Sequence, residues 1–474
     1  MKVFFPFSYY YPETCAGIFV VDNVMELLAN NGTESLLTVP TPTRDVPIGA
    51  EWERDELKYN GKAHIHRFHM YGEGKNPILR ALRYFLCECV QAHYCLWKDY
   101  DVAFIDSTPP IQGLKMPLIK WIRKKPIVYN LQDIFPDSLV NNGLAKKGGL
   151  LWKIGRVIEN FTYRNADKII VISEDFKRNI MAKGVPEDKI VVIYNWVDQN
   201  AVVDIPRSEN KLFNMYGLDR SKFYVTYNGN IGLSQNMELL LQVAKELSNE
   251  REQLSLETNS STRITNEGKV RDEGLEGRDE SAKVQKCKSA KEDIRFVLVG
   301  EGAYKATLIE KLTETFGEAK KINEDGALQC GPFYLLPFQP YEDISHVFSL
   351  GDVSLVISKP GTGAASVPSK TWSIMSASRP VLANFDENEL KIILMQNAEC
   401  RMQNDYLQSK ARGIFTKAGD KEAFKDAIIT LYHNPDLCKQ LGKNGRQFVM
   451  DNLTKEVGTR KYVEVISAVA ERKG

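Results

Sequence analysis

Short apolar runs alternate with amphipathic stretches along most of this chain, and this alternation limits its fold more than any other feature of the sequence. The pattern is typical of βα units that build a parallel sheet. In the first half, strands are expected at residues 3–7, 35–39, 64–68, 102–105, 126–131, 168–172 and 190–194. Helices are expected between most of them, at residues 17–30, 77–97, 111–122, 149–164 and 174–182.

A second series of the same kind starts at "KFYVTYNGNIG" and continues through "IRFVLVGEG", "FYLLPF", "DVSLVIS" and "RPVLANF". With 474 residues, the chain is long enough for two domains that each have their own core. The sequence therefore predicts an α/β protein with two doubly wound domains, at residues 1–205 and 215–445. A last helix at residues 445–474 is expected to pack back on the first domain.

Residues 254–293 interrupt this pattern, because they are rich in Ser, Glu, Lys, Gly and Asn and hold almost no large apolar side chains. Such a segment cannot bury enough apolar surface to offset the entropy that ordering would cost. The sequence predicts a disordered surface insertion here, with a partner-binding segment as the alternative.

Charge and composition exclude several classes of protein. The formal net charge of +1 excludes a strongly basic nucleic-acid binder. No run of about 18 apolar residues occurs, so no segment is expected to span a membrane. The eight cysteines form no CxxC pair and no cluster with histidine, so we expect free thiols in a reducing, cytoplasmic compartment and no metal site.

Three turns in the second half have the composition of a phosphate-binding site. "NGNIG" and "VGEG" each end an apolar strand with glycines, which let the backbone approach a ligand closely. The third turn, "SKPGTGAASVPSK", places small hydroxyl residues and Lys370 just ahead of a helix-like stretch. Free backbone N–H groups at such a helix start would favour an anion. A capped helix with a solvated lysine is the alternative interpretation.

Two common nucleotide motifs are missing from the sequence. No GxGxxG turn follows the first strand, and no GxxxxGK[ST] motif occurs. The oxidoreductase and NTPase interpretations therefore lack their usual support, and nucleotide recognition is expected in the second domain.

The order of seven motifs resembles that of the family 4 glycosyltransferases. They are "YYPETCAGIFVVDNVMELLANNG", "VISEDFKRNIMAKGVPEDKIVVIYNWVD", "YNGNIG", "FVLVGEGAYKATL", "LLPFQPYEDISHVFSLGDVSLVIS", "PSKTWSIMSASRPVLA" and "GKNGRQFV", and they cover nearly the whole chain except the insertion. "YNLQDIFPDSL" and "PSK…RPV" are most similar to the bacterial surface-polysaccharide transferases of the WbuB type, which transfer N-acetyl-L-fucosamine.

The resemblance implies a GT-B fold, in which two Rossmann-like domains face a central cleft. It implies that the second domain holds a nucleotide-sugar donor, most simply UDP-linked, and that the first holds an undecaprenyl-diphosphate-linked saccharide of O-antigen, capsule or exopolysaccharide assembly. It also implies retention of anomeric configuration without a metal ion or other cofactor. The expected location is the inner face of the plasma membrane.

The sequence departs from the family pattern at two places. Many members carry two glutamates at the ends of the stretch that corresponds to Ala365–Ser373, and this chain has neither. Many also carry a basic pair after the first strand of the second domain, where this chain has Asn230 and Gln235. Lys370 and the helix start near Ser366 are the predicted replacements.

The predicted catalytic residues are Asp133 and Lys370. Lys370 would stabilise the charge that develops on the leaving diphosphate, and Asp133 would orient the acceptor or stabilise the sugar cation; a helix N-cap is the alternative role for Asp133, and Asp137 is a weaker candidate. The predicted donor-binding residues are Gly17, Asn230, Gly232, Gly300, Glu301, Gly302, Tyr341, Gly361, Gly363, Ser366, Ser369 and Lys370.

Apolar and basic residues are mixed in "IQGLKMPLIKWIRKKP", which fits a helix lying on anionic lipid. The predicted membrane-contact residues are Lys115, Lys120, Arg123, Lys124 and Lys125. A solvated basic helix end is the alternative.

Three functions stay open from the sequence. The first is a retaining glycosyltransferase of surface-polysaccharide assembly. The second is a GT-B-fold sugar-nucleotide epimerase, which would turn over the donor without an acceptor. The third is a non-catalytic scaffold of a polysaccharide assembly complex, which the missing glutamates would explain.

Overall fold

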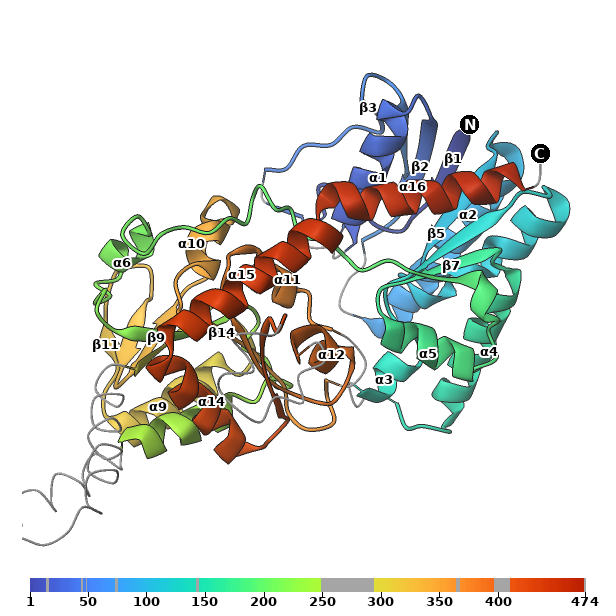
Figure 1. Ribbon diagram of the computed structural model, residues 1–474. Helices are drawn as coiled ribbons and strands as arrows, with labels where there is room; N and C mark the ends of the chain where they lie inside the picture. The colour runs from blue at the N-terminus through green and yellow to red at the C-terminus, as the bar shows by residue number, and fades with distance from the viewer. Residues whose placement is uncertain are drawn as a thin grey trace, which may run out of the picture. The chain divides into compact units, whose positions relative to one another are not determined.

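The computed structural model describes residues 1–13, 17–43, 46–47, 49–72, 76–141, 145–248, 294–363, 367–395 and 410–472. The chain divides into two compact units (Figure 1). The N-terminal unit comprises Met1–Trp196 and Asn452–Gly474, and the C-terminal unit comprises Val197–Asp451. The predicted insertion at residues 254–293 lies outside the described residues.

The N-terminal unit is built on an eight-stranded sheet with the order β3-β4-β2-β1-β5-β6-β7-β8. All neighbours are parallel except the edge strand β3, which is antiparallel to β4. The strands are β1 (Lys2–Pro6), β2 (Glu34–Pro40), β3 (Asp55–Lys58), β4 (Ala63–Phe68), β5 (Val102–Asp106), β6 (Ile127–Leu131), β7 (Lys168–Val171) and β8 (Ile190–Val192).

Alternate residues of β1 enter two different core clusters, Val3 and Phe5 one and Phe4 the other. Both faces of the sheet are therefore covered, which explains why its central strands are nearly continuous apolar runs. The covering elements are α1 (Ile18–Asn30), α2 (Pro77–Trp97), η1 (Pro110–Lys115), η2 (Leu118–Ile122), α3 (Asp137–Asn141), α4 (Leu150–Asn165), α5 (Glu174–Ala182), η3 (Glu187–Lys189) and α16 (Lys455–Glu471).

The last helix, α16, packs on α1, β5 and β6. Thr454 caps its start by accepting a hydrogen bond from the Val457 N–H, and its Tyr462 is fully buried against Trp196. Gly458 lies so close to Trp196 that a Cβ would come within 2.2 Å of the indole ring. The end of the chain therefore completes the core of the N-terminal unit.

The C-terminal unit holds a second eight-stranded sheet with the order β11-β12-β13-β10-β9-β14-β15-β16. Its strands are β9 (Phe223–Asn228), β10 (Ile294–Val299), β11 (Lys320–Lys321), β12 (Leu328–Cys330), β13 (Phe333–Leu336), β14 (Val353–Ile357), β15 (Val381–Phe385) and β16 (Gly413–Lys417). The strands from β13 to β16 are parallel, and β11 and β12 form an antiparallel edge.

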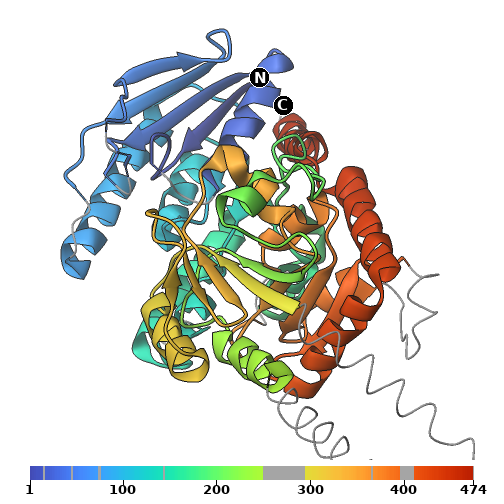
Figure 2. The same cartoon turned by 90° about the vertical axis from the view of Figure 1, so that its left-hand side faces the viewer.

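Here too, neighbouring residues of one strand enter different clusters, Tyr224 one and Val225 the other, so helices cover both faces of the sheet (Figure 2). The labelled helices are α6 (Lys211–Met215), α9 (Lys305–Phe316), η4 (Tyr341–Asp343), α10 (Ile344–Phe348), α11 (Lys370–Ser376), α12 (Glu389–Met395), α14 (Lys421–His433) and α15 (Pro435–Asn452). Residues 237–248 are helical as well. No helix in the described part of the chain is both long and apolar enough to cross a membrane.

The expected strands and most of the expected helices are confirmed, but three features differ from the prediction. Residues 111–122 do not form one α-helix, because η1 is a 3₁₀ helix and η2 a π-helix. The strands β3, β11, β12 and β16 were not expected. The units divide at Trp196 rather than near residues 205–215, because Val203 N and Ile205 N donate hydrogen bonds to Ser345 Oγ and Ser349 Oγ of the C-terminal unit.

Candidate functional site

The loops after β9, β10 and β14 meet at one edge of the C-terminal sheet, because these strands are parallel neighbours. Gly229 N donates to Val299 O over 2.9 Å, and Ile231 N donates to Glu301 O over 2.8 Å. Lys359 N donates to Ser234 O over 2.8 Å. The structure therefore brings the three predicted glycine-bearing turns together at the carboxyl ends of the strands, where open α/β sheets bind ligands.

Gly300 and Gly302 allow the first two loops to approach each other this closely. A Cβ on Gly300 would lie 2.2 Å from Gly229 O, and a Cβ on Gly302 would lie 2.3 Å from Ile231 O. The φ angle of Gly300 is 143°, which side-chain-bearing residues rarely adopt. Glycine is required at both positions by backbone packing.

The third loop is held by an acidic residue that sequence reasoning did not single out. Asp386, which follows β15, accepts hydrogen bonds from Gly361 N over 2.9 Å and from Gly363 N over 2.7 Å. Gly363 packs on Phe385 and on the hydroxyl of Ser358. The predicted N-cap Ser366 lies outside the described residues.

Lys370 is the first residue of α11 and lies against this edge of the sheet. Its Nζ is 3.5 Å from the centroid of the Tyr227 ring, and the Tyr227 hydroxyl donates to Asn230 O over 2.8 Å. Burial lowers the pKa of the Lys370 ammonium to about 7. The lysine of the third turn and the glycine loop of the first are thus connected through one tyrosine.

Among the remaining predicted residues of this edge, some are exposed and others already bind groups of the protein. Asn230 and Ser369 are exposed, and the Ser369 side chain makes no capping hydrogen bond. Gly232 N donates to Gln235 Oε1 over 3.1 Å. Glu301 is exposed and pairs with Lys305 over 2.5 Å.

Two aromatic side chains follow β13, whose carboxyl end neighbours the Gly300 loop through the hydrogen bond from Gly300 N to Leu336 O. Tyr341, a predicted donor contact, is 68% exposed at the start of η4. Phe338 is 76% exposed and was missed by the sequence reasoning, although the same rule of strand ends applies to it. Both rings are available for stacking.

Two hydroxyl groups at this edge lack hydrogen-bond partners within the described part of the chain. They are Ser358 Oγ, at the end of β14, and Thr371 Oγ1, in the first turn of α11. Both oxygens are buried. Buried hydroxyls are normally paired, so these two fit a site that binds a polar ligand.

The N-terminal unit has its own polar group at the carboxyl ends of β5 and β6. Burial raises the pKa of Asp106, the last residue of β5, to about 6, and its Oδ1 accepts from Asn130 Nδ2 over 2.9 Å. Asn130 also accepts from the Tyr462 hydroxyl of α16 over 3.0 Å. Sequence reasoning missed Asp106, although it ends the strand "VAFID" as the same rule requires.

The predicted residue Asp133 follows β6 in the same region. Its side chain reaches the surface, and partial desolvation raises the pKa of its carboxyl. Asp137, the weaker candidate, is instead bound to Lys183 over 2.7 Å. Gly17, a predicted donor contact, belongs to this unit and precedes α1 with a φ of 99°.

The predicted membrane contact at Lys115 is wrong. Lys115 is 2% exposed, and its Nζ binds the buried carboxylate of Glu88 over 2.9 Å. Lys120 binds Asp167 over 3.3 Å, and Arg123 donates to Lys98 O over 3.1 Å. Only Lys124 is exposed among the five predicted residues, and Lys125 is half-buried near Asp101.

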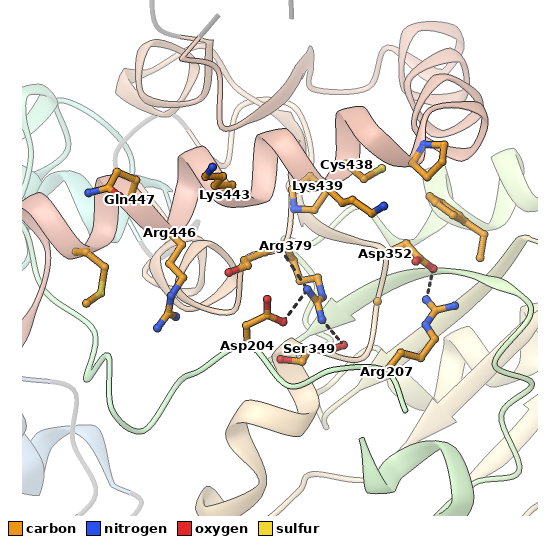
Figure 3. A pocket seen from close by; sticks show the side chains of 16 residues that line it. Asp204, Arg207, Ser349, Asp352, Arg379, Cys438, Lys439, Lys443, Arg446 and Gln447 are labelled. Carbon is orange, nitrogen blue, oxygen red and sulfur yellow. Dashed lines mark hydrogen bonds and ion pairs between the residues drawn. The ribbon is translucent and has the colours of Figure 1, made fainter. Parts of the chain in front are cut away.

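A cavity of about 580 Å³ lies at the opposite edge of the C-terminal sheet, near the starts of β9, β14 and β15 (Figure 3). It contains no predicted donor residue. Two of its three guanidinium groups are paired with carboxylates, Arg379 with Asp204 over 3.0 Å and Arg207 with Asp352, and the third, Arg446, donates to Ser376 O. The carboxyl edge of the sheet therefore remains the candidate donor site.

Comparisons with known proteins agree with this architecture. A sequence model of Glycosyltransferase Family 4 matches residues 19–201. WbjE of Pseudomonas aeruginosa, named as a glycosyltransferase, is 23% identical over 287 residues, which are 60% of this chain and 58% of WbjE. The match thus spans less than two thirds of that relative's length.

WcaI of Escherichia coli K12, named as a colanic acid biosynthesis glycosyl transferase, is 23% identical over 364 residues, which are 74% of this chain and 75% of WcaI. Among solved structures, Anabaena HepE in complex with UDP and glucose is similar with a TM-score of 0.60 and 14% identity, covering 99% of this chain and 100% of HepE. Residues 19–201 are therefore similar to glycosyltransferase family 4, and the chain has the predicted GT-B fold and is related to proteins that are named as glycosyltransferases.

Proposed function

We propose that this protein is a glycosyltransferase that binds a nucleotide-sugar donor at the carboxyl edge of its C-terminal sheet. The observation that carries the proposal is the position of Lys370, which lies against Tyr227 beside three glycine loops that meet at one edge. A diphosphate site requires backbone N–H groups that come close to the ligand, hydroxyl groups that can bind its oxygens and a cation that stabilises its charge. The family 4 match and the names of the relatives support the same class.

The proposed chemistry is transfer with retention of configuration and without a metal ion. The bond between the anomeric carbon and the leaving diphosphate breaks, and a bond from the acceptor oxygen forms on the same face of the sugar. The acceptor's proton moves to the leaving phosphate, so atoms and charges balance. Lys370 and the loop N–H groups stabilise the negative charge that develops on the diphosphate.

The proposed donor is UDP-linked, and its sugar is an N-acetylated amino sugar of the WbuB type. HepE, which shares the fold, was solved with UDP and with UDP-glucose. The exposed rings of Phe338 and Tyr341 lie beyond the end of β13 and suit stacking on a base.

The proposed acceptor is a lipid-linked saccharide, carried on undecaprenyl diphosphate at the inner face of the plasma membrane. WcaI is named for the biosynthesis of colanic acid, which is a polysaccharide. In the N-terminal unit, Asp106 and Asp133 are the carboxylates that follow two neighbouring strands, and we assign them to orienting the acceptor hydroxyl.

Thermal unfolding with UDP, GDP, dTDP and ADP tests the donor site. A ligand at 100 times its Kd stabilises the protein by about 2.7 kcal/mol, which is a rise of several degrees in Tm. We expect UDP to stabilise the wild type and Lys370→Met to lose most of this response. Lys439→Met is the matched control, because Lys439 is 80% exposed on α15, and it should respond like the wild type.

Two outcomes would contradict the proposal. If none of the four diphosphates raises Tm, the donor site fails and a non-catalytic scaffold is favoured. If Lys370→Met responds as strongly as the wild type, the diphosphate binds elsewhere. A donor that is consumed without any acceptor would instead favour an epimerase.

A further inference from the structure

Large apolar side chains are exposed along three elements of the N-terminal unit, and we call this surface the apolar face. The helices α2 and α4 that carry most of it are labelled in Figure 1. Its members on α2 are Ile78, Leu79, Leu82, Phe85 and Leu86, on η1 Leu114, and on α4 Leu150, Leu151, Ile154, Val157 and Phe161. Their exposed fractions run from 37% for Leu86 and Phe161 to 77% for Leu150.

The two helices are amphipathic in the reverse sense. A helix on a water-soluble protein normally turns its apolar stripe toward the core and its polar stripe outward. On α2, the buried side chains include Arg83, Glu88 and Gln91, and on α4 they include Glu159 and Thr162. Polar side chains of each helix thus face the protein, together with Cys87 and Cys95 of α2 and Tyr163 of α4, while most of the large aliphatic side chains face outward.

The three elements form one continuous surface, because η1 packs against both helices. The Lys115 ammonium of η1 binds Glu88 of α2 over 2.9 Å. Gly113 of η1 lies so close to α4 that a Cβ there would be 1.9 Å from Thr162 Oγ1. Leu114, between these two contacts in sequence, is 40% exposed.

The charges of these three elements are one-sided. Their only carboxylates are Glu88 and Glu159, and both are buried. Basic side chains accompany the apolar stripes, with Lys153 and Arg164 exposed on α4. An apolar surface with basic and no exposed acidic side chains complements a bilayer that contains anionic phospholipid.

We infer that the apolar face is the surface by which this protein docks on a membrane, with these side chains entering the boundary between headgroups and acyl chains. Water-soluble monomers rarely expose an apolar patch of this extent. The neighbouring element η2, which packs on α2, adds Trp121 with 70% exposure, and tryptophan favours the membrane interface. This inference rests on the proposed lipid-linked acceptor. It makes the apolar face, rather than Lys115 and its neighbours, the main membrane contact.

Vesicle flotation with the full-length protein tests the inference. The vesicles contain phosphatidylethanolamine with phosphatidylglycerol, or phosphatidylcholine alone. We expect the wild type to float with the anionic vesicles and to bind phosphatidylcholine more weakly. Leu82→Gln and Val157→Gln should each weaken binding on the order of tenfold, since each removes one exposed apolar side chain that the membrane would bury.

Leu57→Gln is the matched control, because Leu57 is 69% exposed on β3 in the same unit but lies outside the apolar face. It should bind vesicles like the wild type. Lys153→Gln should weaken binding to the anionic vesicles and leave binding to phosphatidylcholine unchanged. All variants alter exposed positions, and an unchanged Tm confirms that each is folded.

Three results would overturn the inference. One is a wild type that fails to float, and another is equal binding by Leu82→Gln, Val157→Gln and Leu57→Gln. The third is that Leu82→Gln and Val157→Gln lose self-association in light scattering but still bind vesicles like the wild type. The apolar face would then be covered by a second copy of the chain. Stabilisation by UDP, measured on the same samples, reports separately on the proposed function.

Discussion

Lysine side chains of this chain illustrate how one residue type takes different roles. From the sequence, Lys115 and Lys370 were both predicted to meet an anionic ligand. The structure gives Lys115 a buried carboxylate partner, Glu88, that is distant in sequence. Lys370 has an aromatic ring, Tyr227, and no carboxylate among the causes of its lowered pKa. Only the second lysine is therefore poised for an anionic ligand.

The pH dependence of UDP binding follows from this lysine. Its pKa of about 7 in the free protein means that Lys370 loses its proton as the pH rises from 6 to 8. A bound diphosphate stabilises the ammonium, so binding above pH 7 requires uptake of a proton. We expect calorimetry to show that the Kd for UDP weakens from pH 7 to pH 9, by at most about tenfold per pH unit.

Lys370→Arg and Lys370→Met are the controls for this pH dependence. Arginine keeps its charge throughout this range, so Lys370→Arg should lose the slope while retaining binding. Lys370→Met should bind weakly at every pH. A slope in Lys370→Met equal to that of the wild type would show that another group titrates.

The pH dependence of folding stability has the opposite sign. The free-energy cost of burying the charged lysine is full below pH 7 and disappears as the pH rises toward 10.5.

At the scale of elements, periodicity predicted the long, regular helices and strands. The strand "VSLVI" became β14, and the stretch 77–97 became α2, because a long pattern is little affected by one local contact. Residues 111–122 were expected to be one helix and are not. Pro117, which has no N–H to donate, stands between η1 and η2, and Gly113 packs closely on Thr162 of α4, a contact that depends on the tertiary structure. Periodicity also cannot predict which way α2 and α4 face. It shows that a helix has an apolar stripe, but not whether that stripe packs on the core or points outward.

Part of the candidate site could also be predicted from the sequence. The three glycine turns could be found because each follows an apolar strand, and Phe338 and Asp106 could have been found by the same rule. The contacts of Asp386 with Gly361 and Gly363 could not, because they join segments whose proximity depends on the order of β14 and β15 in the sheet.

Gly300→Ala tests the close contact between the first two loops. The new Cβ would lie 2.2 Å from Gly229 O, so the backbone must move, and we expect a loss of stability of roughly 1–3 kcal/mol. Thermal unfolding should show a drop in Tm of several degrees and a smaller shift on adding UDP. Gly72→Ala is the matched control, because nothing lies within 4 Å of a Cβ there. Equal Tm values for the two variants would contradict the tight packing.

At the scale of the whole molecule, each unit presents a different kind of surface. The C-terminal unit gathers glycine loops, unpartnered hydroxyls and Lys370 at the carboxyl edge of its sheet. The N-terminal unit gathers carboxylates after β5 and β6 and turns the apolar face outward on α2, η1 and α4. A water-soluble nucleotide donor and a lipid-borne acceptor are the pair of substrates that these surfaces suit.

We propose that a sugar is transferred from a nucleotide to a lipid-linked saccharide, and a transfer assay with radiolabelled sugar nucleotides measures this step most directly. The enzyme is incubated with each labelled donor and a bacterial lipid extract that contains polyprenyl-diphosphate saccharides, and label in the butanol phase is counted. We expect one UDP-sugar to label the lipid with the wild type and Lys439→Met, and Lys370→Met to be slower by about a hundredfold or more. Label that never enters the lipid phase with any donor, or equal transfer by Lys370→Met, would contradict the account.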